Sequence, residues 1–208
     1  MGEISGPLRP VFSTLLNRQG MHLVHAAAVG TPRGSLVFAG PPGAGKSTLA
    51  VLCLQAGLAY QSDDLCVLTS EPRPRSLSIY NMAKLREAAF PRFPSLHPIL
   101  SHFEETERKA FFYVHQHFPR QVLKAAPVRA LLLPRIDPHL SASRLERARP
   151  LETAHAVISW TNREFPRSNN AGDRIMMQAV SRIPAYRLHL GQDDRQTLAL
   201  IKGLLDDT

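Results

Sequence analysis

LVFAGPPGAGKSTL, residues 36–49, is the stretch that decides the fold of this chain. Its first four residues, Leu36 to Ala39, form a short apolar run typical of a buried strand. A glycine-rich break follows, and the chain then runs through Lys46-Ser47-Thr48 into a segment compatible with a helix up to Gln55. The stretch therefore matches G-x-x-x-x-G-K-[ST], the phosphate-loop motif, in the strand–loop–helix context that this motif requires.

The residues of this loop have chemical roles in holding a polyphosphate. The glycines let backbone N–H groups turn towards phosphate oxygens, and the helix N-terminus adds partial positive charge. Lys46 adds a full positive charge, and the Ser47 hydroxyl is placed to bind Mg²⁺. A plain Gly-Pro turn would not need a glycine, a lysine and a serine in this order. We therefore predict a nucleoside triphosphate site built from Gly40, Gly43, Ala44, Gly45, Lys46, Ser47 and Thr48.

Composition indicates an ordinary globular protein. The 208 residues suit one domain with a sizeable core, and 44% of them are apolar and 20% charged. No apolar run approaches the length of a membrane span. Only two cysteines occur, Cys53 and Cys66, which indicates no disulfide framework and predicts a reducing, cytoplasmic location.

The net charge of +8 is unusual, and arginine supplies most of it. One interpretation is a generally basic surface without functional meaning, and the other is an anionic ligand or substrate. A nucleic-acid partner is not expected, because the chain has no RNA-binding signature or zinc-finger spacing and its aromatic residues are not interleaved with basic clusters.

Strand-like and helix-like segments alternate around the loop, which predicts an α/β fold with a central sheet flanked by helices. Residues 22–40 are expected to form a hairpin around the turn Thr31-Pro32-Arg33-Gly34. The remaining expected helices lie over 11–17, 47–55, 150–161, 171–182 and 193–205, and the remaining strands over 58–62, 65–69, 128–133 and 184–190.

Prolines and arginines interrupt this regular pattern between residue 71 and about residue 127. We predict that about 70–127 is an insertion that shapes the substrate side, inside a single domain of residues 1–208. Within it we expect a helix over residues 102–118, which Pro119 would end.

Two adjacent carboxylates follow the loop at short range. Asp63 comes seventeen residues after Lys46, after one expected helix and one expected strand, so the chain returns to the sheet edge beside the loop. There, one of Asp63 and Asp64 can hold Mg²⁺ opposite Ser47, and the other can accept the proton of an attacking hydroxyl. A solvated Ser-Asp-Asp turn is the alternative.

Histidines give weaker signals. His25 lies in the strand before the hairpin, where it is either a satisfied core residue or part of the site. His115 and His117 could face one side of a strand as metal ligands, but no third ligand is evident and aromatic packing explains the run FFYVHQHF.

Three pieces of the chain resemble the HPr kinase/phosphorylase family: VHAAAV at 24–29, GPPGAGKST at 40–48 and SDDL at 62–65. The similarity is good from His25 to Leu68. It is looser at YNMAKL (80–85), over the strand at 128–134, and at the C-terminal IPAYRLHL (183–190).

The resemblance implies an HPr kinase-like fold and a kinase that transfers the γ-phosphoryl group of ATP to a serine hydroxyl of a protein or peptide. It implies Asp63 as general base, with His25 orienting it or tuning its pKa. It implies Asp64 and Ser47 as the Mg²⁺ contacts and Lys46 on the β- and γ-phosphates. Family members commonly form symmetric oligomers, so a homo-oligomer is expected as well.

Two features depart from the family pattern. Only a short lead-in precedes the kinase-like part, and the Arg-Gly signature that serves the reverse reaction is absent. The chain is therefore more similar to small stand-alone members that phosphorylate precursor peptides of ribosomal products such as lasso peptides, some at a C-terminal serine. Arg75, Lys84 and Arg135 are the expected acceptor contacts. The alternatives are a small-molecule kinase and a regulatory nucleotide-binding module.

Overall fold

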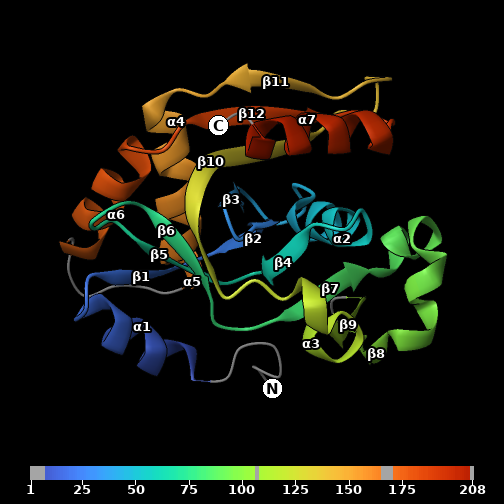
Figure 1. The fold of residues 1–208 in the computed structure, drawn as a ribbon, viewed down its shortest axis with the longest axis horizontal. Coiled ribbons are helices and arrows are strands. Elements are labelled where there is room, and N and C mark those ends of the chain that lie inside the picture. Colours follow the sequence, from blue (N-terminus) through green and yellow to red (C-terminus); the bar gives the residue numbers. More distant parts are fainter. Residues whose placement is uncertain (1–7, 106–107, 165–170, 207–208) are drawn as a thin grey trace.

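A computed structural model describes residues 8–105, 108–164 and 171–206 of the chain. The fold is mixed α/β, with a nine-stranded sheet, a separate three-stranded sheet, and helices on both faces of the larger sheet (Figure 1). No helix in the described part of the chain is long and apolar enough to cross a membrane. The strands of the larger sheet are β1 (Met21–Val24), β2 (Ala26–Thr31), β3 (Gly34–Ala39), β4 (Ala59–Ser62), β5 (Cys66–Thr69), β6 (Arg75–Ser78), β10 (Ala125–Ile136), β11 (Arg144–Arg147) and β12 (Ala185–Leu190).

Strand β10 connects the two parts of the large sheet. The order is β1-β5-β6-β10-β3-β2-β4, with β12 also beside β10 and β11 beside β12. The first residues of β10 pair antiparallel with β6, while the rest lies between the parallel strands β3 and β12. Residues 130–133 of β10 are buried, as expected for an apolar strand that is covered on both faces.

The pairing registers bring three chain segments to one edge of the sheet. Strand β2 runs antiparallel to β3, so Ala26 at the start of β2 faces Ala39 at the end of β3. Strand β4 runs antiparallel to β2, and Ser62 at its end faces Ala28. His25, Gly40 and Asp63, which adjoin these strand ends, therefore meet at the same edge.

Helices cover the two faces of the sheet because side chains alternate along each strand. Leu36 and Phe38 of β3 belong to a core with α2 (Lys46–Gln55) and α7 (Asp194–Asp206). Val37 and Ala39 belong to the opposite core, to which the helical segments between residues 150 and 181 contribute Ala156, Val157, Met176 and Val180. These segments are α4 (Pro150–Ala154), the π-helical η4 (His155–Ser159), α5 (Trp160–Glu164) and α6 (Ala171–Ser181), and a further helix, α1 (Arg9–Asn17), packs by β1.

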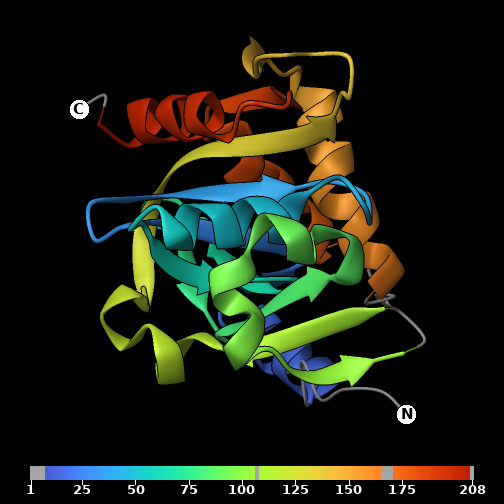
Figure 2. The ribbon, with the colours of Figure 1, turned by 90° about the vertical axis from the view of Figure 1, so that its right-hand side faces the viewer.

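Most of the 71–127 segment lies on the side of α2 away from the large sheet (Figure 2). Its strand β7 contributes Ala83 and Leu85 to the core that α2 shares, and Phe112 of β9 joins them. Among the described residues of this segment, β6 is the strand that joins the large sheet before β10 begins, and Val122 forms an isolated bridge with Tyr60 of β4. The remaining elements are β7 (Met82–Arg86), η1 (Glu87–Arg92), η2 (Pro94–Ile99), β8 (Ser101–Glu104), β9 (Lys109–Tyr113), α3 (Val114–His117) and η3 (Pro119–Gln121).

The helix expected over 102–118 is wrong. The structure has β8 and β9 there, followed by the four-residue α3. The aromatic run at Phe111, Phe112 and Tyr113 favours a strand, and Phe112 is fully buried between neighbouring strands and α2. The other expected helices and strands are confirmed, and β2 and β3 form the expected hairpin around residues 31–34. The hairpin is shorter than residues 22–40, because residues 21–24 form the separate strand β1, which pairs with β5, and His25 lies between β1 and β2 and not within a strand. Strands β6, β7 and β11 were not anticipated.

Candidate active site

The glycine-rich loop, residues 40–45, connects β3 to α2 at the edge described above. Gly43 and Gly45 have φ angles of 83° and 98°, a region that glycine adopts without the steric cost of a Cβ. A Cβ built on Gly43 would meet nothing within 4 Å, so backbone conformation and not space favours glycine there. The loop thus has the strand–loop–helix context that the sequence motif requires.

The Lys46 side chain lies over this loop. Its Nζ donates hydrogen bonds to the carbonyl oxygens of Gly40, at 2.8 Å, and Pro41, at 3.0 Å. The residue is only 6% exposed. The structure therefore holds a full positive charge beside the backbone N–H groups at the start of α2, which favours an anion at this position.

The Asp63 carboxylate accepts several hydrogen bonds beside the loop. The Ser47 hydroxyl donates to its Oδ1 at 2.8 Å, and the backbone N–H of Asp64 donates to the same oxygen at 2.9 Å. The backbone N–H of Lys84, from β7, donates to Oδ2 at 3.2 Å. Asp63 is 4% exposed, so the two carboxylate oxygens are bonded and nearly out of contact with solvent.

Asp64 is more open than Asp63 and is paired with a different group. Its carboxylate forms an ion pair with the Lys84 ammonium, and its side chain is 22% exposed. Its backbone has a φ of 65°, and its carbonyl oxygen accepts a hydrogen bond from the N–H of Ala26. This bond ties the Asp63-Asp64 turn to the start of β2, next to His25.

His25 is a buried neighbour of this cluster. The residue is 9% exposed, and its backbone N–H donates to the Thr161 hydroxyl of α5 at 3.0 Å. Burial and the nearby charge of Lys46 lower its pKa from 6.5 to about 4, although the Asp64 carboxylate opposes this shift. His25 is therefore a neutral imidazole at neutral pH.

The two carboxyl groups have opposite pKa shifts. Burial and the charge of Asp64 raise the pKa of Asp63 to about 6. Burial alone would also raise the pKa of Asp64, but the charge and hydrogen bond of Lys84 outweigh it and lower that pKa to about 2. The Lys84 ammonium, which faces Asp64, therefore separates the pKa values of two otherwise identical carboxyl groups.

The donor atoms present suit Mg²⁺. The hydroxyl of Ser47 and the carboxylate of Asp63 are hard oxygen ligands that already lie in contact, and Mg²⁺ is usually bound by one or two such groups together with substrate phosphates. Within the described ranges, no group of three or more His, Cys, Asp or Glu side chains forms a metal cluster. A site completed by phosphate oxygens needs no such cluster.

The expected acceptor contacts lie in three different places. Lys84 is inside the cluster, where it pairs with Asp64. Arg135 is exposed near the carboxyl end of β10, at the same sheet edge as the loop, in register with His189 of β12. Arg75 pairs with Pro127, near the opposite end of β10, so the structure does not bring Arg75 to the loop.

The histidines of FFYVHQHF lie on α3 and not on a strand. The Nδ1 of His115 is 2.8 Å from the Oδ1 of Asn81, and the His117 ring packs edge-on against Phe112. Two contacts of the site were not anticipated from sequence: the Lys84 ion pair with Asp64 and the Thr161 hydroxyl that holds the His25 backbone.

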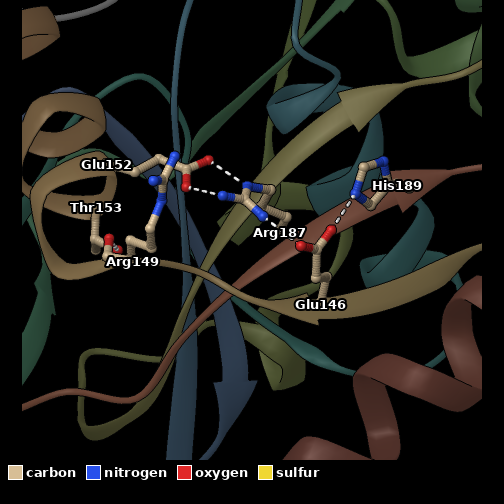
Figure 3. Close-up of polar contacts among 6 residues, drawn as sticks. All are labelled: Glu146, Arg149, Glu152, Thr153, Arg187 and His189. Atoms are coloured by element: carbon tan, nitrogen blue, oxygen red, sulfur yellow. Dashed lines mark hydrogen bonds and ion pairs between the residues drawn. The ribbon is translucent and has the colours of Figure 1, made fainter.

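A network of ion pairs fixes β12 beside this edge (Figure 3). The Arg187 guanidinium donates two hydrogen bonds to Glu152 of α4, at 2.6 and 2.5 Å, and one to Glu146 of β11, at 2.6 Å. The Nε2 of His189 lies 3.4 Å from Glu146. Arg187 and His189 share one face of β12, so Leu188 and Leu190 lie on the other face, towards α2 and α7.

No family model matches the chain, and no curated protein matches it. Among solved structures, the fold is similar to the HPr(Ser) kinase/phosphatase from Coxiella burnetii, with a TM-score of 0.47 and 12% sequence identity. The match covers 88% of this chain and 87% of that one. At this identity, the likeness concerns the path of the chain and does not extend to activity.

Proposed function

We propose that this protein is a kinase that uses ATP and Mg²⁺ to phosphorylate a serine hydroxyl of a peptide or protein. The observation that carries the proposal is the contact between Ser47 and Asp63 beside the glycine-rich loop, with a second carboxylate one residue further on. A site that only binds nucleotide has no need for the second carboxylate. Phosphoryl transfer has a use for both, because one group serves the metal and the other serves the attacking hydroxyl.

The contacts suggest how the two carboxylates share the work. Asp63 bonds to Ser47, so we assign Asp63 to the metal side, where Mg²⁺ would neutralise charge on the phosphate oxygens. Asp64 is the more exposed carboxylate and can face an incoming hydroxyl. This exchanges the two roles that the family resemblance implies.

The pKa values favour the opposite assignment, since a group with a pKa near 6 is the better base at neutral pH. We give more weight to the contacts. The pKa of Asp63 is raised mainly by burial, and a cation bound beside that carboxylate would hold it ionised.

In the proposed reaction, the serine oxygen forms a bond to the γ-phosphorus while the bond to the β,γ-bridging oxygen breaks. Asp64 orients the hydroxyl and receives its proton, and ADP leaves. Lys46 stabilises negative charge on the β- and γ-phosphates. His25 is neutral and buried, so it lies near Asp64 without adding charge to the site.

The proposed acceptor is a ribosomal precursor peptide of the lasso type, modified at a C-terminal serine. Support comes from the family resemblance and from the net charge of +8, which suits an acceptor that ends in a carboxylate. Arg135, exposed at the same edge as the loop, is the proposed contact for that carboxylate.

Phosphorylation assays with two variants test the roles. Asp64→Asn is expected to lower kcat by about 100-fold or more while leaving the Mg²⁺ requirement unchanged. Asp63→Asn is expected to raise the Mg²⁺ concentration needed for half-maximal rate by about tenfold or more. Near wild-type rates for Asp64→Asn would exclude it as the proton acceptor, and an unchanged Mg²⁺ requirement for Asp63→Asn would remove it from the metal side.

The acceptor is tested with synthetic peptides that end in serine, each paired with the same peptide ending in alanine. Mass spectrometry after incubation with ATP and Mg²⁺ should find phosphate on the serine peptides only. Phosphate on a small molecule and on no peptide would support the small-molecule kinase. ATP binding without transfer to any acceptor would support the regulatory module.

A further inference from the structure

A pocket of about 100 Å³ opens beside the glycine-rich loop, at Gly45 and Thr48. One side is formed by α2 and the loop, and the other by the carboxyl ends of β10 and β12 and the start of α7. One water molecule needs about 10–15 Å³ of such space, so the pocket has room for several water molecules. Its lining residues are Gly45, Thr48, Leu49, Leu52, Arg92, Ile136, Leu190, Gly191, Asp194 and Thr197.

The walls of this pocket are largely apolar, although it lies at the surface. Ile136 is 57% exposed, one of the few large apolar side chains with such exposure among the described residues. A Cβ on Gly45 would lie 3.1 Å from Leu190 and 3.6 Å from Ile136, so these two side chains contact the end of the loop. Apolar walls that continue directly from an anion-binding loop suit a ligand with one charged end and one flat apolar end.

A charged pair, Arg92 and Asp194, also lines the pocket. Arg92 ends η1 and Asp194 begins α7, and the Nη2 of Arg92 is 2.5 Å from the Oδ1 of Asp194. The two side chains are 47% and 38% exposed. They offer N–H donors and a carboxylate acceptor to the polar edge of a ring, and a guanidinium can also stack on an aromatic face.

Thr197, in contrast, has a structural role. Its hydroxyl lies 2.7 Å from the Ser143 hydroxyl and 3.0 Å from the Asp193 carbonyl oxygen. The polar groups that can still change partners when a ligand enters are therefore Arg92 and Asp194, together with the Thr48 hydroxyl.

We propose that this pocket is the subsite for the base of the nucleotide, with the ring packed on Ile136 and Leu190 and its polar edge at Arg92 and Asp194. The inference rests on the proposed function, because the triphosphate end is assigned to the glycine-rich loop. It goes further in assigning residues of β10, β12, η1 and α7, none of which belongs to the sequence motif. It also makes the 71–127 segment, through Arg92, part of the nucleotide site.

Calorimetric titration with two probes tests the subsite: ATP, and inorganic tripolyphosphate, which has the phosphates without a base, each with Mg²⁺. Ile136→Asn should weaken ATP binding by about fivefold or more, since it removes apolar contact with the ring. The same variant should bind tripolyphosphate within about twofold of wild type, because an uncharged substitution leaves the electrostatics of the loop unchanged.

The matched control is Leu151→Asn, which makes the same kind of change at an exposed site on α4, where Leu151 is 80% exposed and outside the pocket. It should change neither affinity. A second variant, Lys46→Ala, should weaken both probes, because the loop serves both.

The outcomes separate the two proposals. If Ile136→Asn leaves ATP binding unchanged, or weakens ATP and tripolyphosphate equally, the base subsite is wrong while the loop assignment stands. If wild-type protein binds neither probe, the proposed function fails and the subsite fails with it.

Discussion

Lys84 is the residue whose charge separates the two adjacent carboxylates. Its ammonium faces Asp64, and its charge and hydrogen bond hold the pKa of that carboxyl at about 2 against the effect of burial. Replacing Lys84 with Met should therefore raise the pKa values of both carboxyl groups. We expect the acidic limb of the pH profile of kcat/KM to move up by about one pH unit or more.

The control for Lys84→Met is Arg86→Met, which removes a positive charge from an exposed position on the same strand. It should leave the acidic limb in place. A profile that does not move in Lys84→Met would show that neither Asp63 nor Asp64 sets the acidic limb of the reaction.

His25 should make the stability of the folded protein depend on pH. Its pKa is about 4 in the folded protein and 6.5 when unfolded, so between these values the unfolded state binds the proton. The contribution of His25 is thus complete above pH 6.5 and is lost as the pH falls towards 4. Between pH 7.5 and 4.5, wild type should lose on the order of 2 kcal/mol more unfolding free energy than His25→Gln.

Urea denaturation of both proteins at these two pH values measures this difference. Equal losses for wild type and His25→Gln would mean that the imidazole is already exposed or protonated in the folded state.

At the scale of elements, the same substitution at two glycines near helix ends should change the unfolding free energy in opposite directions. Gly57 follows α2 with a φ of 89°, whereas Gly203 lies inside α7. A Cβ at either position meets nothing within 4 Å, so only backbone preference matters. Gly57→Ala should cost about 1 kcal/mol, and Gly203→Ala should gain about 0.5–1 kcal/mol.

Thermal or urea unfolding of these two variants checks the prediction, and each variant serves as the control for the other. Destabilisation by Gly203→Ala would mean that α7 is not a regular helix at that point.

Elements with strong local signals could be predicted from the sequence. The loop motif, the flanking strand and helix and the turn at residues 31–34 are all encoded within a few residues, and the structure has them in place. Strands β6 and β11 could not be predicted, because RSLS and RLER carry little apolar pattern and pair through long-range partners. The site likewise contains residues that the sequence identifies and a contact that it does not. The order of Lys46, Ser47 and Asp63 was readable, but the approach of Lys84 depends on how β7 packs against α2.

At the scale of the whole molecule, the reactivity of the two cysteines measures whether the two cores unfold cooperatively. Cys53 lies in the core that α2 and α7 share, and Cys66 lies in the core on the opposite face of the large sheet. Both are fully buried, and burial raises the pKa of each thiol to about 12. In the native protein, neither thiol should react with an alkylating reagent unless the structure opens.

If the chain is a single domain, as its length predicts, both cysteines should be alkylated at the same rate, set by global unfolding. Mass spectrometry of peptides after timed alkylation measures the two rates, with fully denatured protein as the control. A much faster reaction at Cys66 than at Cys53 would show that the two layers open separately.

The central position of β10 has a consequence for the order in which the protein is assembled on the ribosome. Strands β2 and β3 form a hairpin from neighbouring residues, but the other neighbour of β3 is β10, which emerges about ninety residues later. Until then, the strand that leads into the glycine-rich loop has an unpaired edge, a surface prone to wrong pairing with other chains. The yield of folded protein during expression should therefore depend on translation rate and temperature more strongly than the stability of the finished protein suggests, because long-range pairing limits the rate of folding.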